Sequence, residues 1–300
     1  MFERRRPQST GHEYQLSTAL KGSTEKRINH DKNKKAFISV LQMTHFPITA
    51  RPKTKLTDAT TLLLDFAIIT YAVSPQKLQE LLPPSLTPDC FTLQDGQDVA
   101  FVSAVPFRDV DFHFHFAPFF KVSMGQTNYR AYVKRKDGTR AVYFFGTTLS
   151  GFWVRIPRDW WKLPWKSAQM QFDTTWAGQR LQHYRLSAQS EWGPAELEMT
   201  GTQQAMDRVD GFSDLDETAT VLTHPLIGYY HRNDGRLGSY SVWHARLDLQ
   251  KAAVQHASFP VFERLGLIDA HSQPHSALVM PQTEFIVQLP PGLAPELEET

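Results

Sequence analysis

Segments rich in β-forming side chains outnumber helical segments along this sequence, and the connections between them are short. Parallel strands need crossover connections of a dozen or more residues, whereas antiparallel neighbours need only a tight turn. One such turn, Lys-Asp-Gly-Thr at residues 136–139, separates two strand-like runs and predicts a hairpin. Beyond the basic N-terminal segment, helical spacing is found at residues 76–82, 216–222 and 259–265. The sequence therefore predicts a mainly β protein of the α+β class, with an antiparallel sheet curled into a clamshell or barrel and a few peripheral helices.

Charge and cysteine content exclude several classes of protein. The 300 residues carry a formal charge of +1, which does not fit a uniformly basic nucleic-acid binder. No apolar run approaches the roughly 20 residues that cross a bilayer, and the N-terminal segment lacks the apolar centre of a secretory signal. The single cysteine, Cys90, cannot form an internal disulfide. We therefore expect a cytoplasmic protein without nucleic-acid or membrane partners.

The uneven distribution of charge predicts a domain boundary. Up to Lys55 the chain has 12 basic and 4 acidic residues, a net charge of +8, and the remainder has 20 basic and 27 acidic residues, a net charge of −7. A strongly charged segment with little apolar surface to bury does not form a core. We predict a flexible basic arm over residues 1–58 and a single folded domain over residues 59–294.

Six segments, in this order and at this spacing, resemble the YqjF-like family, also called DUF2071. They are LQELLPPSL (78–86), DGQDVAFVSAVPF (95–107), QTNYRAYV (126–133), VYFF (142–145), LPWKSAQM (163–170) and SVWHA (241–245). The similarity spans roughly residues 60–290. It implies the fold of acetoacetate decarboxylase, an antiparallel β-clamshell around a central cavity, and it permits assembly into homo-oligomers.

The same resemblance raises the question of a catalytic lysine. The decarboxylase relatives act through a lysine that forms a Schiff base with a β-keto acid, and a neighbouring lysine lowers the pKa of that group. The resemblance places these two lysines just after a proline, which corresponds here to Pro164, and it puts Trp165 at the position of the nucleophile. Lys166 matches only the second lysine. It can be activated by burial in an apolar pocket, or it can lie at the surface with its stem over an aromatic ring. The resemblance thus implies a lyase-like protein without the complete lysine pair.

A second candidate site lies on the strand predicted around residues 128–133. Alternation places Asn128, Arg130 and Tyr132 on one face of this strand. If the face lines the cavity, Arg130 can hold a carboxylate, and Asn128 and Tyr132 can donate hydrogen bonds to a carbonyl or enolate oxygen. The same side chains can instead bond to backbone at the rim of the sheet. The resemblance places a glutamate near this segment, where this chain has Gln126.

Histidines provide two further candidates. Asp111, His113 and His115 fall on one face of a short strand, and a His-x-His pair suits zinc. A catalytic zinc takes three protein ligands, so this segment can instead be an amphipathic lip whose phenylalanines face the cavity, and the resemblance implies no metal. His244, on a predicted strand, is a candidate proton shuttle or a buried histidine bonded to a backbone carbonyl.

Two functions remain open from the sequence. One is an enzyme that acts on a small keto acid or related carboxylate in a central cavity. Its catalytic residues would be Lys166 and His244, and its substrate-binding residues would be Gln126, Asn128, Arg130, Tyr132 and Trp165. The other is a non-catalytic binding protein for a small apolar or carboxylate ligand. The sequence has no dinucleotide fingerprint and no phosphate-binding glycine loop, so we expect no cofactor.

Overall fold

The computed structural model describes residues 50–294, which belong to one compact unit. The predicted basic arm lies outside the described residues as far as residue 49. The described chain enters its first strand, β1, at Ala59 (Ala59–Val73). No helix within residues 50–294 is long and apolar enough to span a membrane.

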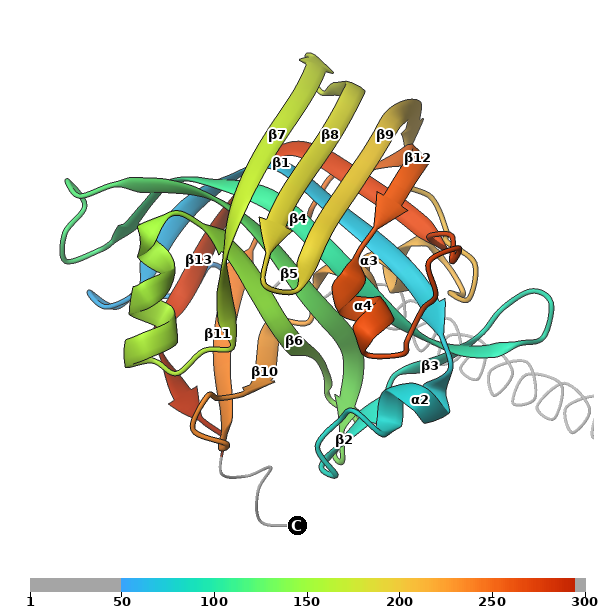
Figure 1. Cartoon of the computed structure of the whole chain (residues 1–300), viewed down its shortest axis with the longest axis horizontal. Coiled ribbons are helices and arrows are strands. Elements are labelled where there is room, and N and C mark those ends of the chain that lie inside the picture. Colours follow the sequence, from blue (N-terminus) through green and yellow to red (C-terminus); the bar gives the residue numbers. More distant parts are fainter. Residues whose placement is uncertain (1–49, 295–300) are drawn as a thin grey trace, which may run out of the picture. The chain divides into compact units, whose positions relative to one another are not determined.

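Thirteen strands of the described residues form a single sheet (Figure 1). After β1 they are β2 (Leu86–Pro88), β3 (Cys90–Thr92), β4 (Asp98–Phe114), β5 (Val122–Arg135), β6 (Arg140–Ser150), β7 (Trp165–Ala177), β8 (Arg180–Ser190), β9 (Gly193–Ala205), β10 (Ile227–His231), β11 (Leu237–His244), β12 (Gln250–Ser258) and β13 (Ser276–Leu293). Strands β5, β6, β10, β11, β13, β1 and β4 pair in a closed ring, and β7, β8, β9 and β12 form a second layer beside it. The predicted mainly β fold is confirmed.

Two strand pairs are parallel, which the sequence analysis did not predict. Strand β6 pairs in parallel with both β7 and β10, whereas the other pairs are antiparallel. The chain leaves β6 through two short helical segments, η1 (Phe152–Val154) and η2 (Ile156–Trp160), before β7 begins. This connection is long enough to return the chain to the same end of the sheet, so β7 can run parallel to β6. The sheet is therefore mixed rather than wholly antiparallel.

The predicted hairpin and helices are present. The turn between β5 and β6 is closed by a hydrogen bond from the amide of Arg135 to the carbonyl of Thr139, at 2.9 Å, and Gly138 takes a φ of +82° that favours glycine. Helix α2 (Pro75–Gln79) begins after Ser74, whose hydroxyl accepts a hydrogen bond from the backbone of the first turn. Helices α3 (Leu215–Thr223) and α4 (Pro260–Arg264) also fall where helical spacing predicts them.

Strands β7 and β12 were not predicted. Along β7, exposed polar side chains alternate with half-buried ones, and few of the residues are strong β-formers. Both strands belong to the layer beside the ring, where one face is covered and the other meets solvent. A strand that buries only one face shows a weak apolar signal in the sequence, because pairing with its neighbours decides its conformation.

A buried carboxylate joins this second layer to the ring. Asp65 interrupts β1 with a φ of +53°, in a stretch where the register with β4 shifts. Its carboxylate forms an ion pair with Arg108 and accepts hydrogen bonds from Thr174 Oγ1 at 2.8 Å and Trp176 Nε1 at 2.9 Å. Thr174 and Trp176 belong to β7. Asp65 therefore holds β7 against β1 and β4.

Candidate functional site

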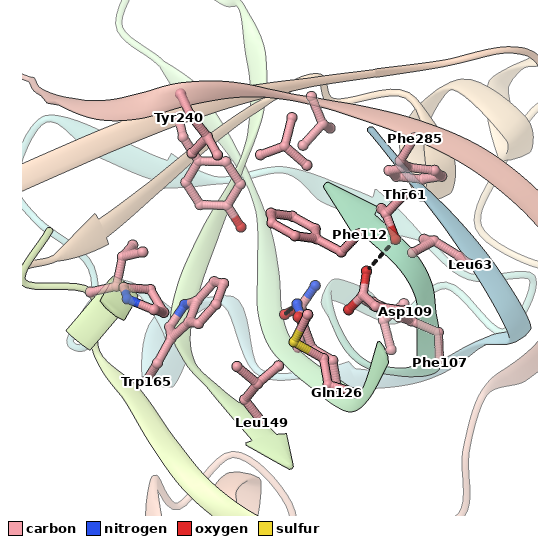
Figure 2. Close-up of a pocket in the computed structure, with 18 of the residues that line it drawn as sticks. Thr61, Leu63, Phe107, Asp109, Phe112, Gln126, Leu149, Trp165, Tyr240 and Phe285 are labelled. Carbon is pink, nitrogen blue, oxygen red and sulfur yellow. Dashed lines mark hydrogen bonds between the residues drawn. The ribbon is translucent and has the colours of Figure 1, made fainter. Parts of the chain in front are cut away.

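An internal cavity of about 190 Å³ lies inside the ring of strands (Figure 2). Its walls come from β1, β4, β5, β6, β11 and β13, from the end of α3, and from the segment that links β6 to β7. Most of the lining is apolar, including many aromatic rings. The polar side chains of the wall are Thr61, Asp109, Gln126, Asn128, Arg130, Thr223, Tyr240 and His244. A mainly apolar cavity with a few converging polar groups is the usual form of a small-molecule site.

One face of strand β5 lines the cavity from Val122 to Arg130. Alternate residues Val122, Met124, Gln126, Asn128 and Arg130 all line it, as expected for side chains two apart on a strand. Of the residues singled out in the sequence, the structure therefore brings Gln126, Asn128 and Arg130 together. The next residue on this face, Tyr132, does not line the cavity: it is buried behind Arg130, and its hydroxyl lies 2.9 Å from Ser103 Oγ and 3.3 Å from the carbonyl of Leu222.

Within the described part of the chain, Arg130 is a cation without an acidic partner. Its Nη2 donates to the carbonyl of Leu222 at 2.8 Å, near the end of α3, and to the hydroxyl of Tyr132 at 3.4 Å. Its Nε is buried and has no hydrogen-bond partner, and within the described residues no carboxylate forms an ion pair with the guanidinium. A buried charge is costly unless it is paired and hydrogen-bonded. The end of α3 holds the side chain in place, and Arg130 lines the cavity with a charge that no carboxylate of residues 50–294 pairs with.

A short chain of hydrogen bonds orients the two amides next to Arg130. Gln126 Nε2 donates to Asn128 Oδ1 at 2.8 Å, and Thr147 Oγ1 donates to the same oxygen at 2.8 Å. With Oδ1 occupied twice, the amide nitrogen of Asn128 is left as a donor for the cavity. Gln126 likewise keeps its carbonyl oxygen as an acceptor.

Asp109 is the acidic residue of the cavity, and the sequence analysis missed it. It is 5% exposed, and its Oδ1 accepts a hydrogen bond from Thr61 Oγ1 at 3.0 Å, drawn in Figure 2. Burial raises the pKa of Asp109 to about 7, against a smaller lowering by the Thr61 hydroxyl. This carboxyl can therefore both release and accept a proton near neutral pH. The only sequence signal was an acidic residue following the apolar run of residues 99–107.

Tyr240 presents a second proton-bearing group. Its hydroxyl points into the cavity in Figure 2, and its ring is stacked on Phe144 with centroids 5.4 Å apart. Burial raises the pKa of Tyr240 above its usual range, with further raising by Tyr230 and Asp109 and an opposing effect of Arg130. The hydroxyl therefore stays protonated at neutral pH and can donate a hydrogen bond to a ligand oxygen.

His244 lines the cavity but has no free ring nitrogen. Its Nδ1 lies 2.7 Å from the carbonyl of Ala245, and its Nε2 lies 2.8 Å from the carbonyl of Thr223. Burial lowers the pKa of His244, and the two carbonyls act in the opposite direction. The side chain is 2% exposed and stacks on Phe285 at 4.5 Å. The geometry matches a buried histidine bonded to backbone, the alternative left open by the sequence, and does not favour a proton shuttle.

The structure does not bring Lys166 to the cavity. At the start of β7 the side chains alternate, so Trp165 lines the cavity and Lys166 points away from it. Lys166 Nζ lies 2.5 Å from Glu191 Oε1, and both side chains are partly exposed. Among the described residues no lysine lines the cavity. The arrangement therefore gives Schiff-base chemistry no amine inside this site.

His113 on β4 and His115, directly after that strand, are likewise outside the cavity. His113 Nδ1 lies 2.6 Å from the carbonyl of Asp111, and His115 Nε2 lies 2.8 Å from Thr60 Oγ1. Within residues 50–294 no group of three metal-ligating side chains is present. Phe112 and Phe114 face the cavity instead, as expected for an amphipathic lip. A bulge at Asp111, with a φ of +58°, allows Asp109 and Phe112 to face the same side although they are three residues apart.

Three solved structures show where this fold occurs. An acetoacetate decarboxylase-like enzyme from Sphingomonas wittichii RW1 is 11% identical to this chain with a TM-score of 0.53, over 80% of this chain and 94% of that one. The enduracididine biosynthesis enzyme MppR complexed with pyruvate is 11% identical with a TM-score of 0.53, over 81% and 92%. The same enzyme with the condensation product of pyruvate and imidazole 4-carboxaldehyde is 10% identical with a TM-score of 0.52, over 80% and 90%. At these identities the likeness establishes the fold alone.

The family assignment rests on sequence. No curated protein matches the chain significantly. A family model, DUF2071, described as an uncharacterized conserved protein, matches residues 60–284. This range covers β1 from its second residue, β2 to β12 and the first half of β13, and so includes the strand residues that line the cavity except those of β13. The chain belongs to the DUF2071 family and has a fold like that of acetoacetate decarboxylase-like proteins.

Proposed function

We propose that this protein is an enzyme that binds an oxo-carboxylate in the cavity and moves a proton on it. The observation that carries the proposal is Arg130, a cation in the cavity wall that has no acidic partner among residues 50–294. A carboxylate of the ligand supplies the missing anion, and charge-assisted hydrogen bonds to a guanidinium are among the strongest in proteins.

Asp109 is the proton carrier in this proposal. General acid–base catalysis works best when the pKa of the group lies near the working pH, and the pKa of Asp109 is raised to about 7 by burial. The ionised carboxylate takes a proton from the carbon next to a ketone of the ligand, and the electron pair of that C–H bond moves to the ketone oxygen. The hydroxyl of Tyr240 donates a hydrogen bond to the resulting enolate oxygen. Asp109 then returns a proton to carbon or to oxygen.

This mechanism differs from that of a lysine-dependent decarboxylase. It needs no covalent intermediate, which agrees with the position of Lys166 outside the cavity. The extensive apolar wall favours a second candidate, a non-catalytic binding protein for an apolar carboxylate. The two candidates share the role of Arg130 and differ in the role of Asp109.

Proton exchange distinguishes the two candidates. The protein is incubated in D₂O with oxo-carboxylates of four to twelve carbons, and loss of the signals of hydrogens next to the ketone is followed by NMR. We expect the wild type to catalyse exchange with a rate that rises with pH around pH 7, because the ionised form of Asp109 is the base. Removing a general base typically costs a factor of about 100 or more, so Asp109→Asn should nearly abolish exchange. Binding without any exchange by the wild type would favour the binding protein.

Location and assembly belong to this proposal as well. Cys90 is the only cysteine, and it is a free, exposed thiol. Free exposed thiols persist in reducing compartments, so we propose a cytoplasmic location. The family resemblance also permits a homo-oligomer, which sedimentation of the purified chain would test.

A further inference from the structure

We infer that the ligand is elongated, with its carboxylate at Arg130 and an apolar tail directed to the opening of the cavity beside Phe120. This inference rests on the proposed function and deepens it by naming the substrate class: carboxylates with a chain of on the order of ten carbons, rather than short keto acids such as pyruvate.

The wall of the cavity changes character along β5. Towards the β4–β5 loop the cavity-facing residues Val122 and Met124 are apolar, and further along the strand Gln126, Asn128 and Arg130 are polar or charged. Along β5 the cavity therefore has an apolar end, formed by Val122 and Met124 with Asp109 opposite them on β4, and a cationic end at Arg130. A ligand that matches both ends is amphipathic, with its anionic group at one terminus.

The apolar end is the open one. Phe120 lines the cavity and is also 55% exposed. Trp161 and Ile156, from the segment after β6, line the same cavity. Trp161 packs edge-on against Phe114, with ring centroids 6.4 Å apart. An alkyl tail that leaves the cavity here stays in contact with aromatic rings up to the surface.

The pairing of β4 with β5 gives an estimate of the distance between Asp109 and Arg130 along the strands. Asp109 on β4 is opposite Met124, which lies six residues before Arg130 on β5. At about 3.3 Å per residue, the two levels are roughly 20 Å apart along the strand. The guanidinium of Arg130 is held beside Tyr132 and the Leu222 carbonyl, so it does not extend along β5 towards Met124. A ligand that reaches both Arg130 and Asp109 is therefore elongated, with on the order of ten bonds or more at roughly 1.2 Å per bond.

A short keto acid held by Arg130 does not reach Asp109. Three bonds span only about 4 Å. The ketone on which Asp109 acts should therefore lie well away from the carboxylate, in the middle or outer part of the chain.

A chain-length series tests the inference by calorimetry. Butyrate, octanoate and dodecanoate are titrated into the full chain. Burial of each methylene strengthens binding by roughly fourfold, so affinity should rise steeply from butyrate to dodecanoate. The substitution Met124→Trp fills the apolar end and should weaken dodecanoate at least tenfold while leaving butyrate unchanged.

Two neighbouring phenylalanines provide a matched control. Phe120 lines the cavity, whereas Phe119 is 87% exposed and does not. We expect Phe120→Ala to weaken dodecanoate binding several-fold and Phe119→Ala to have no effect. Equal losses in the two variants would place the tail on the outer surface and overturn the inference.

The exchange assay locates the reacting group. Dodecanoates that carry a ketone at successive positions are compared with 3-oxobutyrate in D₂O. The inference predicts the fastest exchange for ketones in the middle or outer part of the chain. Fast, Asp109-dependent exchange of 3-oxobutyrate, or equal affinities for butyrate and dodecanoate, would overturn the elongated ligand while leaving the proposed function intact. If Arg130→Met changes no affinity in the series, the proposed function itself fails.

Discussion

Two buried aspartates, Asp65 and Asp109, lie on neighbouring strands and have opposite surroundings. Asp65 is paired with Arg108 and accepts two further side-chain hydrogen bonds. Asp109 receives one, from Thr61, and the cation of the cavity, Arg130, forms no ion pair with it. The carboxylate of Asp65 is therefore paired and hydrogen-bonded within the fold. Asp109 and Arg130 are instead able to interact with a ligand.

The largest expected effect is the loss of stability when the paired carboxylate of Asp65 is removed. Loss of one partner from a buried ion pair typically costs about 3–5 kcal/mol, so Asp65→Ala should lower the free energy of unfolding by that amount in urea denaturation. Asp65→Asn keeps a side chain that tolerates a positive φ and accepts hydrogen bonds, and it should cost less. A loss below about 1 kcal/mol in Asp65→Ala would show that the pair contributes little to the fold.

The next largest effect is the contribution of Asp109 to the pH dependence of stability. The pKa of this carboxyl is raised to about 7 in the folded protein, so the folded state binds more protons than the unfolded state between about pH 4 and pH 7. The contribution of Asp109 to stability is therefore greatest below about pH 4 and falls as pH rises to 7, by a few kcal/mol in total. Asp109→Asn should lose less stability than the wild type between pH 5 and pH 8. Identical losses in urea unfolding would contradict the raised pKa.

The smallest effect is expected at Lys166. An exposed ion pair such as that with Glu191 is worth about 0–1 kcal/mol. Lys166→Ala should therefore change the free energy of unfolding by no more than that, and it should leave deuterium exchange and ligand affinity unchanged. A large loss of deuterium exchange in Lys166→Ala would show that Lys166 takes part in the reaction.

Sequence reasoning identified one wall of the cavity, but it did not identify Asp109 or the outward direction of Lys166. Period-two alternation placed Asn128 and Arg130 on one face, and this needs only a regular strand. The same alternation places Trp165 and Lys166 on opposite faces of the strand, but the sequence does not tell which of the two faces the cavity. Asp109 was missed because a bulge at Asp111 breaks the alternation that the histidine segment suggested. One carbonyl at His244 belongs to the next residue, Ala245, but the other belongs to Thr223, whose position beside His244 the sequence does not reveal.

The central claim is that Arg130 selects an anionic ligand in an apolar cavity. Comparing the affinities of a charged and an uncharged ligand with the same tail tests it most directly. Octanoate and octanol differ in the group that would meet Arg130 and share an apolar tail. Hydrogen bonds to a charged group contribute about 1.5–3 kcal/mol, so the wild type should bind octanoate roughly 10-fold to 100-fold more tightly than octanol. In Arg130→Met this preference should disappear while octanol affinity is retained. An octanoate preference that is the same in both proteins would contradict the account.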